Sequence, residues 1–137
     1  MIVCDDDVEL NSFIRNYFKL GGYETHQALS AKECIDKLAE IGNAIDVIIV
    51  DGKIASDRSV MLIVNARRIN KNVKVFVLAN RSLSEDKTRI MDYGSDEFTV
   101  KPISMESLIN KVNLQLLEAA KALFPPKNLY ISISLLQ

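Results

Sequence analysis

Carboxylates and one lysine stand directly after short apolar runs of this chain. Asp5 and Asp6 follow the first of these runs, Asp51 follows the third, and Lys101 follows the fifth. Carboxylates that crowd together repel, and one of them stays protonated unless a cation lies between them. Oxygen ligands of this kind suit Mg²⁺, and the ammonium group of Lys101 adds a second positive charge. These residue types are the ones that phosphoryl transfer requires. In that reaction, cations neutralise the phosphoryl oxygens while a carboxylate attacks in line.

Each of these residues also has a purely structural interpretation. An aspartate at the end of a strand often caps the helix that follows, and Asp6 or Asp7 could do only that. A Lys-Pro pair such as Lys101-Pro102 is often no more than a turn. The combination of all these residues, in this order along the chain, favours a functional site.

The elements that must position these residues alternate between strands and helices. Capping-box patterns open two of the expected helices, at Ser30–Glu33 and at Ser82–Glu85. Gly21-Gly22 ends the first helix. Three of the strands are continuous apolar runs, as expected for strands that are buried on both faces of a parallel sheet. The strands are expected at 2–4, 24–28, 46–50, 73–79 and 97–100; the third helix is expected at 59–69, the fourth ends at Tyr93-Gly94, and the fifth follows Ser104.

This order predicts an α/β fold of the (βα)5 type, with a parallel sheet covered by helices on both faces. Sites in such open sheets form beyond the carboxyl ends of the strands. Asp5, Asp6, Asp51 and Lys101 would therefore meet at one edge. The fourth strand would bring Ala79 and Asn80 to the same edge.

The chain resembles the receiver domain of two-component response regulators. The resemblance rests on Asp5-Asp6, on Asp51 after Val47–Val50, and on Lys101-Pro102 after Gly94–Phe98, and it covers about residues 1–122. It implies a flavodoxin-like, three-layer fold with strand order 2-1-3-4-5. It also implies a signalling domain that is not an enzyme beyond its own phosphorylation and dephosphorylation.

The resemblance assigns a role to each residue of the candidate site. Asp51 would accept a phosphoryl group from a histidine kinase, and Lys101 would contact that group. Asp6 and Asp51 would hold Mg²⁺ together with the main-chain carbonyl of Lys53, and Asp5 would assist through water. Phe98 stands where the family has a rotating aromatic switch. The Lys101-Pro102 bond is commonly cis in relatives.

The sequence departs from the family pattern at the end of the fourth strand and after Asp51. Ala79 stands where relatives usually have Thr or Ser, so the hydroxyl that would donate to a phosphoryl oxygen is missing. Such a bond is worth roughly 1.5–3 kcal/mol. Asn80 stands where a very small residue is usual, and its amide could replace the hydroxyl or crowd the site. Ile54-Ala55 replaces the Met-Pro that is common after the acceptor.

Two alternatives therefore stay open beside a phosphorylated switch. The first is a degenerate receiver, a protein-interaction module whose switching is weakened because of Ala79. The second is an enzyme of the haloacid-dehalogenase type, but Lys53 stands where that family has its second aspartate.

Length and composition limit the number of domains and the classes of partner, whichever of these functions the chain has. The chain has 137 residues, of which 48% are apolar and 26% charged, and its net charge is −1. These values predict a single domain with at most a short appendage. Together with the resemblance, they imply a receiver domain over residues 1–122, followed by an extension over 123–137. Near-neutrality gives no general drive toward nucleic acid or an anionic membrane. No apolar run could span a bilayer, and no signal peptide is recognisable, so a cytoplasmic location is expected.

The cysteines and the histidine exclude several other chemistries. Cys4 and Cys34 are too few for a disulfide framework and match no zinc spacing, so we expect two buried, apolar side chains. The single histidine, His26, excludes a paired-histidine metal site, and a nucleophilic triad would have to use it at the start of a strand.

The expected partners follow from the resemblance. They are a sensor histidine kinase or phosphotransfer protein, an output partner or domain, and a second copy of the chain. The output surface would comprise the fourth helix, the fifth strand and the fifth helix, with Lys87, Arg89, Glu97 and Lys111. No DNA-binding helix-turn-helix is recognisable after residue 122. The basic cluster from Arg67 to Lys74 could suggest nucleic acid, but a solvated helix end explains it as well. Residues 129–137 alternate as a strand does, and could add an edge strand, pair with another chain, open a further domain or be a free end.

Overall fold

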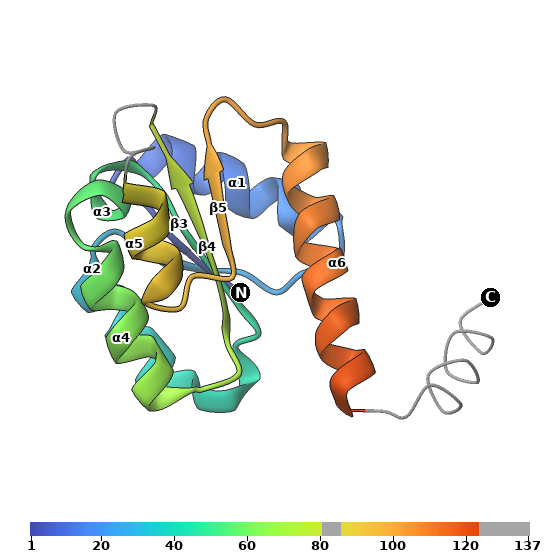
Figure 1. The fold of residues 1–137 in the computed structure, drawn as a ribbon. Coiled ribbons are helices and arrows are strands. Elements are labelled where there is room, and N and C mark those ends of the chain that lie inside the picture. The colour runs from blue at the N-terminus through green and yellow to red at the C-terminus, as the bar shows by residue number, and fades with distance from the viewer. Residues whose placement is uncertain (81–85, 124–137) are drawn as a thin grey trace.

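Five short strands lie parallel in one sheet, in the order β2-β1-β3-β4-β5. A computed structural model of the chain describes residues 1–80 and 86–123 (Figure 1). The predicted strand order is thereby confirmed, and the carboxyl ends of all five strands lie at one edge. The strands are β1 (Ile2–Cys4), β2 (His26–Ala28), β3 (Val47–Val50), β4 (Lys74–Ala79) and β5 (Glu97–Val100).

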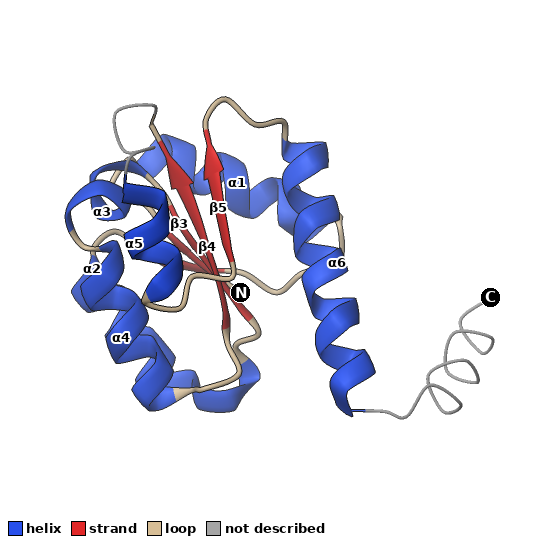
Figure 2. Cartoon of the chain, in the orientation of Figure 1, coloured by secondary structure: helices blue, strands red, loops and turns tan. Residues whose placement is uncertain are grey.

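Helices alternate with these strands along the chain (Figure 2). Asp7 caps the first helix by accepting from the Leu10 amide at 3.1 Å, and Ser30 caps the second by accepting from the Glu33 amide, also at 3.1 Å. The structural role that the sequence allowed for Asp7 and the capping box at Ser30 are both confirmed. The helices are α1 (Val8–Leu20), α2 (Ala31–Ile41), α3 (Gly52–Asp57), α4 (Ser59–Ile69), α5 (Lys87–Asp92) and α6 (Met105–Leu123), with a 3-10 turn η1 (Gly42–Ala44) after α2.

Alternation along the strands divides the core into two layers. Ile48 and Val50 of β3 belong to the layer packed under α2, α3, α4 and α5, whereas Val47 and Ile49 belong to the layer packed under α1 and α6. Figure 1 shows α4 and α5 on one side of the sheet and α6 on the other. Because both faces are covered, all four residues of β3 are fully buried.

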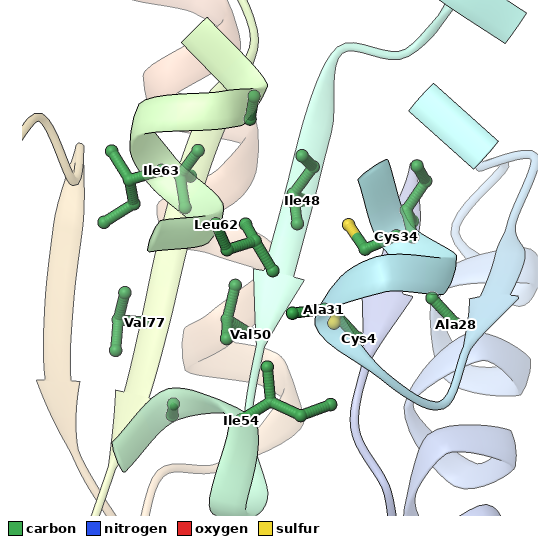
Figure 3. Packing of buried hydrophobic residues seen from close by; sticks show 14 of the residues in the cluster. Cys4, Ala28, Ala31, Cys34, Ile48, Val50, Ile54, Leu62, Ile63 and Val77 are labelled. Atoms are coloured by element: carbon green, nitrogen blue, oxygen red, sulfur yellow. The ribbon is translucent and has the colours of Figure 1, made fainter. Parts of the chain in front are cut away.

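Cys4 and Cys34 are part of the first layer, as Figure 3 shows. Both side chains are fully buried and both thiols are free, so the prediction of small apolar cysteines is confirmed. A hydrogen bond with the Cys34 thiol, and then burial, raises the pKa of the Cys4 thiol well above its usual range. The Cys4 thiol therefore stays protonated, and the two side chains pack as small apolar groups between β1 and α2.

The basic cluster after α4 is used inside the fold. Arg67 Nη2 lies 2.7 Å from Asp96 Oδ2, and Lys74 Nζ lies 3.7 Å from Asp96 Oδ1. Arg67 also donates to the carbonyls of Val73 and Gly94. These contacts tie α4 to the starts of β4 and β5, so the structural interpretation of this cluster is favoured over a nucleic-acid surface.

The structure differs from the expected elements at two places. A helix, α3, lies between Asp51 and Ser59, where no helix was expected. The second strand begins at His26, two residues later than expected. The expected start of the fourth helix at Ser82–Glu85 and the strand pattern of 129–137 lie outside the described residues. Within the described ranges, no helix has the length and apolar character needed to cross a bilayer.

Candidate functional site

Asp51 lies at the carboxyl end of the central strand β3, where the sequence placed it. Its side chain is only 2% exposed. Its main-chain N–H donates to the Cys4 carbonyl at 2.9 Å, which continues the ladder between β3 and β1. Its Oδ1 accepts from the Gly52 amide at 2.6 Å. The carboxylate is therefore held in one orientation at the edge of the sheet.

Lys101 reaches Asp51 from the end of β5. Its Nζ lies 2.8 Å from Asp51 Oδ1, and this ion pair joins residues that are fifty positions apart in the chain. The Lys101 main-chain N–H donates to the Ala79 carbonyl at 2.7 Å, and the Lys101-Pro102 bond is cis. The predicted meeting of the strand-five lysine with the strand-three aspartate is thus confirmed.

Asp5 and Asp6 stand beside Asp51 at the end of β1. Gly52, which follows Asp51, has a φ of +66° and lies directly under their carboxylates. A Cβ atom on Gly52 would lie 2.6 Å from Asp6 Oδ1 and 2.7 Å from Asp5 Oδ1. Only glycine leaves these two oxygens room to converge there.

The two carboxylates differ in their surroundings. Asp5 is fully buried, its Oδ1 accepts from the Asp7 amide at 2.9 Å, and its Oδ2 has no hydrogen-bond partner in the described parts of the chain. Burial, and then the charges of Asp51 and Asp6, raise the pKa of Asp5 to about 6, although the Asp7 amide and Lys101 oppose this. Asp6 is exposed, and its Oδ1 accepts from the Lys53 amide at 3.2 Å.

These residues suit a magnesium ion by their chemistry. Mg²⁺ takes one or two carboxylates and keeps several waters, so it needs no closed cage of protein ligands. No group of three or more His, Cys, Asp or Glu side chains that could hold a metal is found in residues 1–80 and 86–123. The unpartnered Oδ2 of Asp5 and the oxygens converging over Gly52 are what such an ion would satisfy.

Lys53 and the end of β4 border the carboxylates of the site. The Lys53 side chain is exposed and the Lys53 carbonyl accepts from Ser56 Oγ at 3.0 Å. Ala79 is buried and offers no donor, and Asn80 is exposed without a side-chain hydrogen bond to any described residue. Phe98 is 6% exposed and points into the layer under α2–α5, so the aromatic side chain at this position lies inward.

The sequence did not predict that Gly52 and Asn11 belong to this region. Gly52 directly follows Asp51 at the end of a strand. A glycine at such a position can indicate that other groups come close to the backbone there, and this was the signal that the sequence offered. Asn11 gave no such signal, because one polar residue among apolar ones in a helix normally faces water. In the structure Asn11 is fully buried behind Asp5.

Comparisons with known proteins agree with this arrangement. The family model of the response regulator receiver domain matches residues 1–113. The transcriptional regulatory protein PrrA of Mycobacterium bovis is 27% identical over 112 residues, which are 82% of this chain and 47% of PrrA. The chain thus spans about half the length of the curated relatives it matches.

Solved structures show the same fold. A receiver domain protein from Clostridium thermocellum superposes with a TM-score of 0.81 at 24% identity, over 90% of this chain and 97% of that one. A response regulator protein from Burkholderia pseudomallei, solved with a phosphorylated aspartic acid, a calcium ion and citrate, superposes with a TM-score of 0.66 at 24% identity, over 91% of this chain and 74% of that one. With the family model covering most of its length, this chain belongs to the response regulator receiver family of two-component signalling systems.

Proposed function

We propose that Asp51 accepts a phosphoryl group from a phosphohistidine, with Mg²⁺ as cofactor. The observation that carries this proposal is the 2.8 Å contact between Lys101 Nζ and Asp51 Oδ1, beside the two carboxylates of β1. The Burkholderia pseudomallei protein of the same fold, solved with a phosphorylated aspartic acid and a calcium ion, supports an aspartate as the phosphoacceptor.

The two carboxylate oxygens of Asp51 have different contacts and therefore different proposed roles. Oδ1 is held by the Gly52 amide and Lys101, so Oδ2 is the oxygen available to attack phosphorus. As the new O–P bond forms, the P–N bond of the donor breaks, and the bonding electrons and a proton go to the imidazole. Lys101 would then neutralise a phosphoryl oxygen. Asp5, Asp6, Asp51 and the Lys53 carbonyl would hold Mg²⁺, which supplies further neutralisation of the phosphoryl oxygens.

Approach to the site is provided by a cavity next to Asp6. It has a volume of about 360 Å³ and lies between the start of α2 and the region of α3 and α4. Asp6 and Lys53 line it, together with Lys32 and Arg58. The exposed carboxylate of Asp6 therefore opens onto this cavity.

The proposed role places the chain between an input and an output in the cytoplasm. The input would be a sensor histidine kinase or a phosphotransfer protein. The added charge, about −1.5 to −2, would bias the surface of α5, β5 and α6, which an output partner, an output domain or a second copy would bind. Glu97 and Lys111, two of the residues expected there, pair at 3.1 Å between β5 and α6. No direct contact with nucleic acid or membrane is proposed for this domain.

The test is intact-mass measurement after incubation with a small acyl phosphate and Mg²⁺. One phosphoryl adduct is expected on the unaltered chain and none on Asp51→Asn. Asp46→Asn is the matched control, because Asp46 is exposed directly before β3, at the opposite end of this strand from Asp51, and should leave the adduct in place. An unaltered chain without an adduct would exclude the proposed phosphoacceptor.

The buried Ala79 supports a second candidate, a receiver that binds partners with weakened switching. Amide NMR shifts with and without beryllofluoride separate the two. Shifts that extend to Phe98 and α5 indicate a working switch. Shifts confined to the neighbourhood of Asp51 indicate the interaction module.

A further inference from the structure

Asn11 is a buried amide in α1 that contacts the ends of two strands. It is fully buried, and its Nδ2 lies 3.0 Å from the Val3 carbonyl, 3.1 Å from the Asp5 carbonyl and 3.0 Å from the Ala28 carbonyl. An amide nitrogen has two hydrogens, so one of them is shared between two of the three acceptors. One side chain thus satisfies three main-chain oxygens where β1 and β2 stop.

The orientation of this amide is determined by its neighbours. Arg15 Nε, one turn along α1, donates to Asn11 Oδ1 at 2.8 Å, and Arg15 Nη2 donates to Gln27 Oε1 at 2.9 Å. A guanidinium only donates and a carbonyl only accepts, so Oδ1 must face Arg15 and Nδ2 must face the three carbonyls. Gln27, in β2, thus holds the guanidinium of Arg15, whose Nε contacts Asn11.

These bonds hold the backbone of Asp5 from both directions. The Asp5 carbonyl accepts from Asn11, and the Asp5 amide donates to the Ala28 carbonyl at 3.1 Å, which also accepts from Asn11. Among the described residues, the side chain of Asp5 has one hydrogen bond of its own, from the Asp7 amide. The direction of this buried carboxylate therefore depends mainly on how its backbone is held.

We propose that Asn11, locked by Arg15, is a positioning residue that aims the Asp5 carboxylate at the cation site beside Asp51. This inference rests on the proposed function for its metal, but the geometry it invokes belongs to the chain itself. Groups that orient metal ligands from behind typically change metal affinity 10–100-fold when removed.

The test compares Asn11→Leu with Asn70→Leu. Leucine has nearly the shape of asparagine but cannot donate. Asn70 is the matched control, because it is also buried and its Nδ2 donates to the Ile45 carbonyl at 3.0 Å, yet it lies after α4 at the opposite edge of the sheet. Asn11→Leu removes a donor from three main-chain carbonyls and Asn70→Leu removes one from a single carbonyl, so both should lower the midpoint of thermal unfolding.

Only Asn11→Leu should affect the cation site. Calorimetric titration with Mg²⁺, well below both unfolding midpoints, should show Kd about tenfold or more higher for Asn11→Leu and unchanged for Asn70→Leu. In the metal-free proteins, hydrogen exchange of the Asp5 and Asp7 amides should be about tenfold faster in Asn11→Leu alone. Arg15→Leu, which keeps Asn11 and alters a half-exposed side chain, should change both quantities in the same direction by a smaller factor.

The two readouts separate the two proposals. If the unaltered chain binds no Mg²⁺, the proposed function fails, and the metal-free exchange rates still decide the role of Asn11. If Arg15→Leu and a folded Asn11→Leu leave the Asp5 and Asp7 amides as protected as in the unaltered chain, the positioning role is wrong. If Asn11→Leu does not fold, Arg15→Leu decides alone.

Discussion

At the scale of single residues, Asp5 is a carboxylate that the fold buries without satisfying both of its oxygens. Oδ1 accepts from the Asp7 amide, and Oδ2 has no partner in the described residues. Lys101 pairs with Asp51 and not with Asp5. Ionising the buried Asp5 carboxylate in this position is costly, and a bound cation would lower that cost.

The raised pKa of Asp5 predicts how stability depends on pH. Its pKa is about 6 in the folded chain, against an ordinary value of 3.8. A raised pKa means that the folded state binds the proton more tightly, so this contribution is present in full below about pH 4 and is lost as pH rises through about 6. Relative to Asp5→Asn, the free energy of unfolding of the metal-free chain should therefore fall by on the order of 2 kcal/mol between about pH 4 and pH 7.

Urea unfolding in the presence of a chelator, at several pH values for both proteins, measures this difference. Added Mg²⁺ at about pH 7 should restore much of the lost stability in the unaltered chain, because a ligand that binds only the folded state stabilises it. Parallel pH profiles for the two proteins would contradict the prediction.

At the scale of elements, the carboxylates of Asp5 and Asp6 constrain which residue can stand at the start of α3. Gly52 has a φ of +66° and no room for a Cβ beneath Asp5 and Asp6, whereas Gly42 has a φ of +68° and open space around its Cα. Alanine at either position carries the cost of a positive φ, on the order of 1–3 kcal/mol. Only at Gly52 would it also push the two carboxylates apart.

Gly52→Ala should therefore lose more stability than Gly42→Ala and should also lose most of its Mg²⁺ affinity. Chemical denaturation of both variants measures the first effect, and calorimetric titration measures the second. Equal losses of stability together with equal Mg²⁺ affinities would show that the crowding over Gly52 has no consequence.

How far the elements could be predicted depended on their length and burial. β3 and β4 were expected within one residue of their bounds, because strands covered on both faces are continuous apolar runs. α3 was not expected, because it is six residues long and begins with a glycine, which normally interrupts a helix. The site residues Asp5, Asp6, Asp51 and Lys101 followed from the strand ends. Asn11 did not, because its burial is decided by how α1 packs on β1 and β2.

At the scale of the whole molecule, the core formed by the described residues uses α6 only in part. The layer under α1 and α6 takes Leu108 and Val112 from this helix as fully buried residues and Leu116 as a partly buried one. Among the described residues, the layer under α2–α5 takes none from α6. Within the described ranges, the contribution of α6 to the core therefore reaches Leu116, even though the helix extends to Leu123.

Two truncations test this arrangement. A chain that ends at Leu123 should unfold with a free energy within about 0.5 kcal/mol of the full chain and should accept a phosphoryl group at Asp51 as readily, because every core side chain found buried in the described residues is retained. A chain that ends at Asn110 loses Val112 and Leu116, leaves one face of the sheet open along β3 and β4, and should lose several kcal/mol or fail to fold. Circular dichroism with urea titration measures both, and intact-mass measurement of the adduct tests the longer one. A large loss of stability in the longer truncation would show that residues 124–137 take part in the domain, contrary to the boundary predicted at 122.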